Sequence, residues 1–226
     1  MSGSSTMPGR TIAIGDVHGC SAALAALIDA IEPGPEDVVV TLGDYIDRGP
    51  DSRGVLELLI DLGRRCRLVP LLGNHEELLL DVRARRHPIS WLLGIGGVAT
   101  LDSYGPGRDL ALIPEGHLAF LEGCLDYHET PRHIFLHANY DPDLPMEEQP
   151  YSRLRWESLR AATPAPHPSG KTVIVGHTSQ RGGEILDLGH LKCIDTFCFG
   201  GGWLSALDVD TLQVWQANKE GELRGG

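Results

Sequence analysis

Three short polar motifs, each placed directly after an apolar run, constrain this 226-residue chain more than any other feature. They are Gly15-Asp16-Val17-His18-Gly19, Gly43-Asp44-Tyr45-Ile46-Asp47-Arg48-Gly49 and Gly73-Asn74-His75-Glu76, in that order and at nearly equal spacing. Each motif supplies oxygen or imidazole groups, which are donors that divalent metal ions bind in proteins. The pattern predicts a fold that brings the ends of three strands to one site.

The segments around the motifs alternate between strand and helix patterns. We expect strands at residues 11–14, 37–42 and 68–72, and helices at residues 21–31, 51–66 and 77–86. Ser52 is a plausible N-cap of the second helix. Such alternation indicates a largely parallel sheet, in which ligands bind beyond the carboxyl ends of the strands. All three motifs fall at those ends.

The remaining part of the chain has a different pattern. Residues 87–130 carry glycine-rich punctuation around short helix-like stretches and predict an inserted cap or substrate-facing segment. Short strands then follow, which predict a second, mixed or antiparallel sheet, at residues 133–136, 172–175, 184–188, 191–194, 203–209 and 212–216. We expect one domain over residues 11–218, with mobile tails at residues 1–10 and 219–226.

Charge and composition exclude several classes of partner. The chain has 19 basic and 31 acidic residues, so its average surface repels nucleic acids and anionic membranes. A phosphate ligand would need a local positive centre, which bound divalent cations would supply. The five cysteines are scattered, and the sequence shows neither a signal segment nor a membrane-spanning apolar run. We therefore expect a cytoplasmic protein with reduced thiols, of an oligomeric state that the sequence does not indicate.

Residues far apart in the sequence offer a set of metal donors. Asp16 and His18 are two residues apart at a strand end, so both side chains can point to one side. Asp44 has two carboxylate oxygens that could bridge two cations, and Asn74 offers a neutral carbonyl oxygen. Two later histidines also end apolar strands and provide further imidazole donors: His137 and His177.

The three motifs and the two later histidines resemble the phosphoprotein phosphatase (PPP) family of metallophosphoesterases. The resemblance covers most of the chain outside the insert and the tail, and is strongest to the bacterial and phage type. That type includes lambda-like protein phosphatases and the symmetrical dinucleoside tetraphosphatases. The resemblance implies an α/β fold, namely a four-layer α/β/β/α sandwich of two mixed sheets flanked by helices. It also implies a binuclear site filled by manganese, iron or zinc.

The resemblance further implies a role for each metal donor by its position in the motifs. Asp16 and His18 would hold the first metal, and Asp44 would bridge both ions. The second metal would be held by three residues: Asn74, His137 and His177. The nucleophile would be a metal-bound hydroxide, whose formation near neutral pH the cations make possible.

Other motif residues would act on the substrate. The resemblance makes His75 the general acid that protonates the leaving oxygen, with Asp47 beside it. A carboxylate next to an imidazole raises the pKa of the imidazole and fixes its tautomer, so Asp47 would orient the His75 ring and favour its protonated form. Arg48 would bind the phosphate as a bidentate fork. Arg155 is our candidate for a second phosphate-binding arginine by its neighbourhood alone, with Arg153 close behind.

We expect a metal-dependent phosphomonoester hydrolase whose leading substrates are phosphoserine and phosphothreonine in proteins. One alternative is a symmetrical bis(5'-nucleosyl)-tetraphosphatase, because residues 201–207 resemble a segment near the end of those enzymes. Another is a non-catalytic phosphate-binding module on the same scaffold. The intact set of His75, Asp47 and Arg48 argues against the latter.

Overall fold

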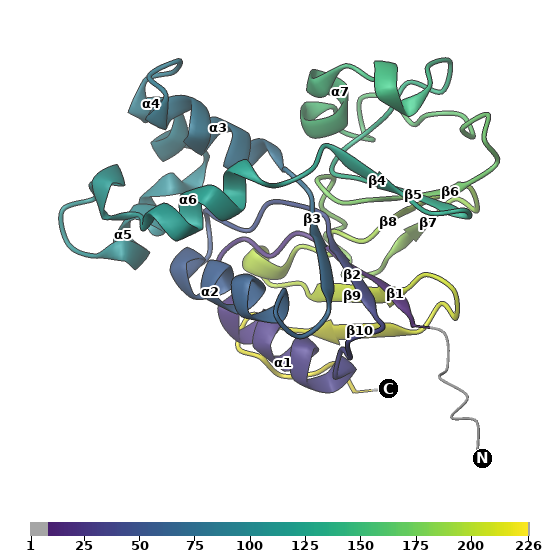
Figure 1. Ribbon diagram of the computed structural model, residues 1–226, viewed down its shortest axis with the longest axis horizontal. Coiled ribbons are helices and arrows are strands. Elements are labelled where there is room, and N and C mark those ends of the chain that lie inside the picture. The colour runs from purple at the N-terminus through teal and green to yellow at the C-terminus, as the bar shows by residue number, and fades with distance from the viewer. Residues whose placement is uncertain (1–8, 226) are drawn as a thin grey trace, which may run out of the picture.

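The structure, a computed structural model, describes residues 9–225 of the chain. Two five-stranded sheets form its centre, and helices lie on their outer sides (Figure 1). Residues 1–8 and 226 belong to the two predicted tails and lie outside the described residues.

The first sheet has the strand order β10-β9-β1-β2-β3. Its strands are β1 (Thr11–Ile14), β2 (Val38–Thr41), β3 (Arg67–Pro70), β9 (Leu204–Asp208) and β10 (Val214–Ala217). Strands β1, β2 and β3 are parallel, as the sequence predicts. The placement of the last two strands in the second sheet was wrong, because β9 pairs antiparallel with β1, and β10 with β9. All five residues of β9 are buried, which suits an inner position beside β1.

The second sheet has the order β4-β5-β6-β8-β7 and is mixed. Its strands are β4 (Tyr127–Glu129), β5 (His133–Leu136), β6 (Thr172–Val175), β7 (Leu186–Asp187) and β8 (Leu191–Cys193). The three inner strands are parallel to one another, and the two edge strands are antiparallel to their neighbours. The sequence did not predict β4, which has three half-buried residues and no apolar run.

Apolar side chains fill the spaces between four layers. Helices α1 (Ser21–Ile31) and α2 (Ser52–Leu62) pack on the outer face of the first sheet (Figure 1). A second cluster, which includes Ala13, Val40 and Phe135, lies between the two sheets. The outer face of the second sheet packs against residues of α7 (Tyr151–Trp156) and the loops beside it. This is the predicted arrangement of two mixed sheets flanked by helices.

The predicted insert is mostly helical. It contains α4 (Ile89–Leu92), the π-helix η1 (Leu93–Gly97), α5 (Val98–Tyr104), the 3-10 helix η2 (Leu110–Leu112) and α6 (Glu115–Glu122). These elements lie beside α2 and α3 (Asn74–Arg83) (Figure 1). The insert therefore packs against the two helices that follow or contain the second and third motifs.

Two helix starts differ from the sequence predictions. Helix α2 is capped by Asp51 and not by Ser52, because the Asp51 carboxylate accepts the Gly54 amide at 2.9 Å. Helix α3 begins at Asn74, three residues earlier than expected, since Glu76 accepts the amide of Gly73 at 3.1 Å. The third motif is therefore the first turn of a helix.

The end of the chain lies against the first sheet. The amide of Arg224 donates to the carbonyl of Gln216 in β10 at 2.8 Å, and the Arg224 guanidinium contacts Glu184 at 2.5 Å. The mobility that we expected for this tail stays a prediction. Among the described residues no helix has the length and hydropathy needed to cross a bilayer.

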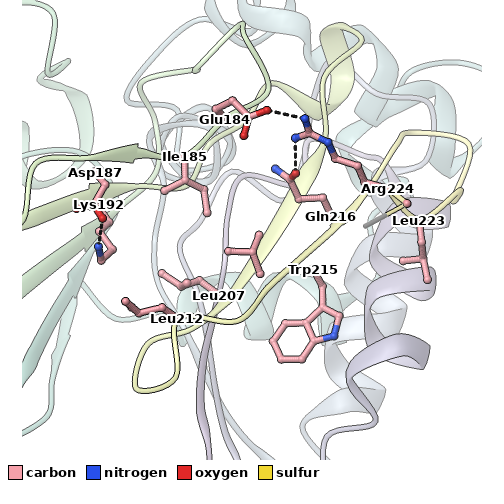
Figure 2. A pocket seen from close by; sticks show the side chains of 12 residues that line it. Glu184, Ile185, Asp187, Lys192, Leu207, Leu212, Trp215, Gln216, Leu223 and Arg224 are labelled. Atoms are coloured by element: carbon pink, nitrogen blue, oxygen red, sulfur yellow. Dashed lines mark hydrogen bonds and ion pairs between the residues drawn. The ribbon is translucent and has the colours of Figure 1, made fainter.

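A pocket of about 500 Å³ lies beside this tail, along β9 and β10 and near β7 (Figure 2). Its apolar lining includes Ile185, Leu207 and Leu212, and charged side chains stand around it.

Candidate metal centre

The predicted site residues meet where parallel strands of both sheets end. Asp16 and His18 follow β1, Asp44 follows β2, and Asn74 follows β3. The second sheet contributes two histidines that follow β5 and β6: His137 and His177. The carboxyl ends of parallel strands thus deliver donors from both sheets to one crevice.

Glycines allow the first two motifs to pack against each other. The amide of His18 donates to the carbonyl of Asp44 at 2.7 Å. A Cβ atom on Gly49 would lie 2.0 Å from the His18 carbonyl oxygen, and one on Gly19 would lie 2.7 Å from that of Gly49. Gly19 also has a φ of +63°, where glycine is strongly preferred. The two loops can therefore approach closely enough to share a metal site.

One group of donors joins the two sheets. The Nδ1–H of His137 donates to the Leu42 carbonyl at 2.7 Å, and the Nε2–H of His177 donates to the Trp156 carbonyl at 3.1 Å. The other nitrogen of each ring therefore carries a lone pair. These two nitrogens lie 3.2 Å apart, and each lies 3.1 Å from Oδ1 of Asn74. Acceptors this close repel one another unless a cation lies among them.

Asp44 connects this group to a second one. Its Oδ1 lies 3.4 Å from Nε2 of His137, and its Oδ2 lies 3.4 Å from Nε2 of His18 and 3.9 Å from Nε2 of His75. The structure thus contains two sets of donors that could each hold an ion, and Asp44 belongs to both. This geometry suits a bridging carboxylate.

Asp16 lies beside these two sets and belongs to neither. Its Oδ2 accepts the amide of His177 at 2.9 Å, and its buried Oδ1 has no hydrogen-bond partner among the described residues. A buried carboxylate oxygen without a donor is costly unless it meets a cation. The metal-binding role of Asp16 stays a prediction, which the unpartnered oxygen favours.

The electrostatics of the crevice also fit bound cations. Burial, assisted by the nearby charges of Asp195 and Asp44, raises the pKa of Asp16 well above its usual range. Burial lowers the pKa of His18 to about 3 and that of His177 to about 4. Neutral imidazole is the form that binds metal, and a cation would restore the charge of the acids. Imidazole, carboxylate and amide oxygen together suit manganese, iron or zinc.

His75 and Asp47 form the predicted pair. Nδ1 of His75 lies 2.7 Å from Oδ2 of Asp47, and both side chains are buried. Burial acts to lower the pKa of His75, but the carboxylates of Asp44 and Asp47 outweigh it and raise the pKa above its usual value. Because Nδ1 donates to Asp47, Nε2 is the atom that faces the crevice.

The sequence predicted no function in the site for Glu76, yet this residue holds the loop of residues 44–46, which we call the bridging loop because it contains Asp44. Its fully buried carboxylate accepts the amides of Asp44 and Tyr45, both at 2.8 Å, and that of Ile46 at 3.3 Å. Burial and the charge of Asp44 raise the pKa of Glu76 to about 8, while these amides oppose the shift. The Glu three residues after Gly73 was the available signal, since such a residue commonly accepts backbone amides at a helix start.

Phe199, which the sequence did not single out, supports the predicted phosphate clamp. The Arg48 guanidinium carbon lies 4.7 Å from the centre of the Phe199 ring, and Nη1 of Arg48 lies 2.8 Å from Nε2 of His18. The Phe199 ring also meets the His18 ring edge-on at 4.9 Å. One aromatic ring therefore positions both a donor and the arginine.

The structure places Arg155 in contact with acids. Its guanidinium pairs with Glu77 and Asp126, and its carbon lies 4.8 Å from the centre of the Tyr151 ring. Arg153 instead contacts Glu157 at 3.1 Å. Neither arginine is brought to the donor sets by these contacts, and their role in phosphate binding stays a prediction.

Comparison with known proteins identifies the scaffold. Residues 9–200 match the family described as calcineurin-like phosphoesterase. The chain belongs to this family. It is accordingly a metallophosphoesterase, a hydrolase of phosphoric esters whose family uses divalent metals, and the donor sets described above provide groups that could bind them.

Relatives of this metallophosphoesterase carry two different names. Serine/threonine-protein phosphatase 1 of Salmonella typhimurium is 29% identical over 198 residues, which cover 85% of this chain and 88% of the relative. The symmetrical bis(5'-nucleosyl)-tetraphosphatase of Erwinia tasmaniensis is 47% identical over 75 residues, but these cover 33% of this chain and 27% of the relative.

A solved structure supports the fold. A protein provisionally named a diadenosine tetraphosphatase superposes with a TM-score of 0.71 and 24% identity, over 94% of each chain. At this identity the likeness concerns the architecture of the metallophosphoesterase and not its substrate.

Proposed function

We propose that this metallophosphoesterase is a phosphomonoesterase that hydrolyses phosphoserine and phosphothreonine in proteins. The proposal rests chiefly on one observation: the His75 ring that Asp47 holds lies 3.9 Å from Asp44, the carboxylate that the two donor sets share. A proton donor beside a binuclear metal site is the arrangement that cleavage of a phosphate ester with a poor leaving group needs.

The metals in this proposal are two divalent cations, manganese first, with iron or zinc as alternatives. We assign them to six residues by motif position and donor type: Asp16, His18, Asp44, Asn74, His137 and His177. When bound, such cations lower the pKa of a bound water and stabilise charge on phosphate oxygens. His75 is assigned as the acid by its motif position, with Nδ1 held by Asp47 and Nε2 facing the crevice.

Proton donation and phosphate binding are carried out by side chains of the protein. Asp47 fixes the His75 ring so that a protonated Nε2 can give its proton to the leaving oxygen. Arg48, supported by Phe199, would bind two phosphate oxygens with its planar fork. Arg155 would join it if the substrate drew it away from Glu77 and Asp126.

A symmetrical dinucleoside tetraphosphatase is the second candidate within the same chemistry. The high identity to such an enzyme over 75 residues favours it, as does the resemblance of residues 201–207 to a segment of those enzymes. The match to the protein phosphatase extends over 85% of this chain, which is why we place protein substrates first.

Turnover measured side by side on a phosphoserine peptide and on diadenosine tetraphosphate separates these candidates. Pure protein loaded with manganese, iron or zinc should hydrolyse the peptide with the higher kcat/KM, and a chelator should abolish the activity reversibly. A higher kcat/KM for the dinucleotide would reverse the assignment. Absence of any hydrolysis by metal-loaded protein would favour a non-catalytic phosphate-binding module.

A further inference from the structure

One threonine of the insert bonds directly to Asp47 of the second motif. Thr100 lies in α5 and is fully buried. Its hydroxyl donates to Oδ1 of Asp47 at 2.5 Å and accepts the amide of Asp47 at 2.8 Å. The same residue that holds His75 is therefore bound at both its side chain and its backbone by the insert.

Hydrogen-bond counting fixes the direction of every bond in this group. A hydroxyl has one proton, and Thr100 gives its proton to the Asp47 carboxylate. Ser52, whose Oγ lies 3.0 Å from that of Thr100, must then be the donor of their shared bond. The Ser52 oxygen also accepts from the Asp47 amide at 3.1 Å, so this one N–H is shared between the two hydroxyl oxygens. No member of this buried group is free to rotate without the loss of a hydrogen bond.

The loop that this group holds is strained. Asp47 and Arg48 both have a φ of +70°, in the left-handed region that is unfavourable for residues with a Cβ atom. The insert also binds the second of these residues, because the Arg48 amide donates to the carbonyl of Gly96 at 3.2 Å. Position 96 requires glycine for this contact, because a Cβ atom would lie 2.8 Å from Cγ of Arg48.

We propose that Thr100 is a positioning residue for the reaction, which acts through Asp47 on His75. One oxygen of Asp47 meets Nδ1 of His75 at 2.7 Å, and Thr100 fixes the other oxygen. The carboxylate plane, and with it the His75 ring, is thereby set by the insert. This inference rests on the proposed phosphomonoesterase function, and it gives the insert a role in catalysis.

The alternative is that Thr100 only packs α5 against α2. Loss of acid catalysis and loss of packing differ in their dependence on the leaving group. A poor leaving group such as a serine alkoxide needs the proton, whereas p-nitrophenolate leaves well without it. A variant that misplaces His75 should therefore lose more activity on phosphoserine than on p-nitrophenyl phosphate.

The test compares Thr100→Val with Thr100→Ser in the metal-loaded, full-length protein. Thr100→Val should lower kcat on a phosphoserine peptide about tenfold or more, with a clearly smaller loss on p-nitrophenyl phosphate, and Thr100→Ser should restore most of it. Ser103→Ala is the matched control, because Ser103 lies in the same helix and bonds to the Thr100 carbonyl at 2.7 Å. It should leave the ratio of the two activities unchanged.

A second arm uses His75→Asn as the background. There, Thr100→Val should cause no further loss, because the group through which it acts is gone. Equal losses on both substrates, or an additive loss in this background, would overturn the inference while the function stands. If Thr100→Val does not fold, Thr100→Ala is judged by the same ratio. A wild-type protein inert on both substrates would instead refute the proposed function.

Discussion

The donor crevice and the pocket beside β10 differ in how their polar groups are paired. In the pocket, Arg224 contacts Glu184 at 2.5 Å and Gln216 at 2.7 Å, and Lys192 pairs with Asp187 (Figure 2). In the crevice, acceptors face acceptors, and Oδ1 of Asp16 is buried without a hydrogen-bond partner among residues 9–225.

This contrast shows that incompletely paired polar groups, more than volume, indicate a reactive site. The pocket has volume and apolar lining, but its named charges already have partners. The crevice has costly, incompletely paired groups and strained loops, which a protein retains where a ligand or ion offsets the cost. Substitutions should therefore have very different effects in the two regions.

Loss of the shared carboxylate should have the largest effect. Asp44→Asn removes a charge that both donor sets use, so both ions should be lost together and turnover should fall to background. Elemental analysis with activity assays checks this. Selective loss of one ion would argue against a bridge.

Removal of the proton donor should have the next largest effect. His75→Asn should lower turnover of a phosphoserine peptide by about 10²–10⁴-fold, the usual contribution of general acid catalysis, with metal content nearly unchanged. Steady-state kinetics and elemental analysis on the same sample measure both. Full activity in this variant would remove the role of His75.

Glu76→Gln tests how the bridging loop is held. The new amide would turn N–H groups toward backbone amides that now donate to the carboxylate, so the free energy of unfolding should fall by about 1–3 kcal/mol. Denaturant titration measures it. Glu57→Gln is the control, because Glu57 is exposed and pairs with Arg53 on the surface; a loss as small as that of the control would contradict the loop-holding role.

The smallest effect is expected at the pocket. Leu212 is exposed and has a φ of +63°, so Leu212→Gly relieves backbone strain in the turn before β10. Turnover should stay within about twofold, and the unfolding free energy should change by less than about 1 kcal/mol. A large loss of turnover would break the distinction between the two regions.

Local sequence patterns were sufficient for the elements that precede the donors. Residues 11–14, 21–31 and 172–175 were predicted with the bounds that the structure has, because buried apolar runs and helical periodicity are strong signals. The rule that parallel strands end at one edge predicted that the three motifs converge, whereas His137 and His177 were added to the site by the family resemblance.

Contacts between distant segments could not be read from the same patterns. The pairing of β9 with β1 depends on which edge of the sheet is free, and Ser52 and Thr100 meet only after the insert folds onto α2. Glu76 accepts amides of residues about 30 positions earlier, which its neighbours in the sequence do not indicate. The hydrogen-bond partners of these polar side chains are set by the tertiary fold and not by neighbouring residues.

The order of the donors along the chain also bears on how the protein is made. Asp16 emerges from the ribosome 161 residues before His177, and β1 gains its neighbour β9 later still. A nascent chain holds at most part of the donor sets. Binding of ions by the complete donor sets must consequently wait until His177 has been made, long after the three motifs that open the site.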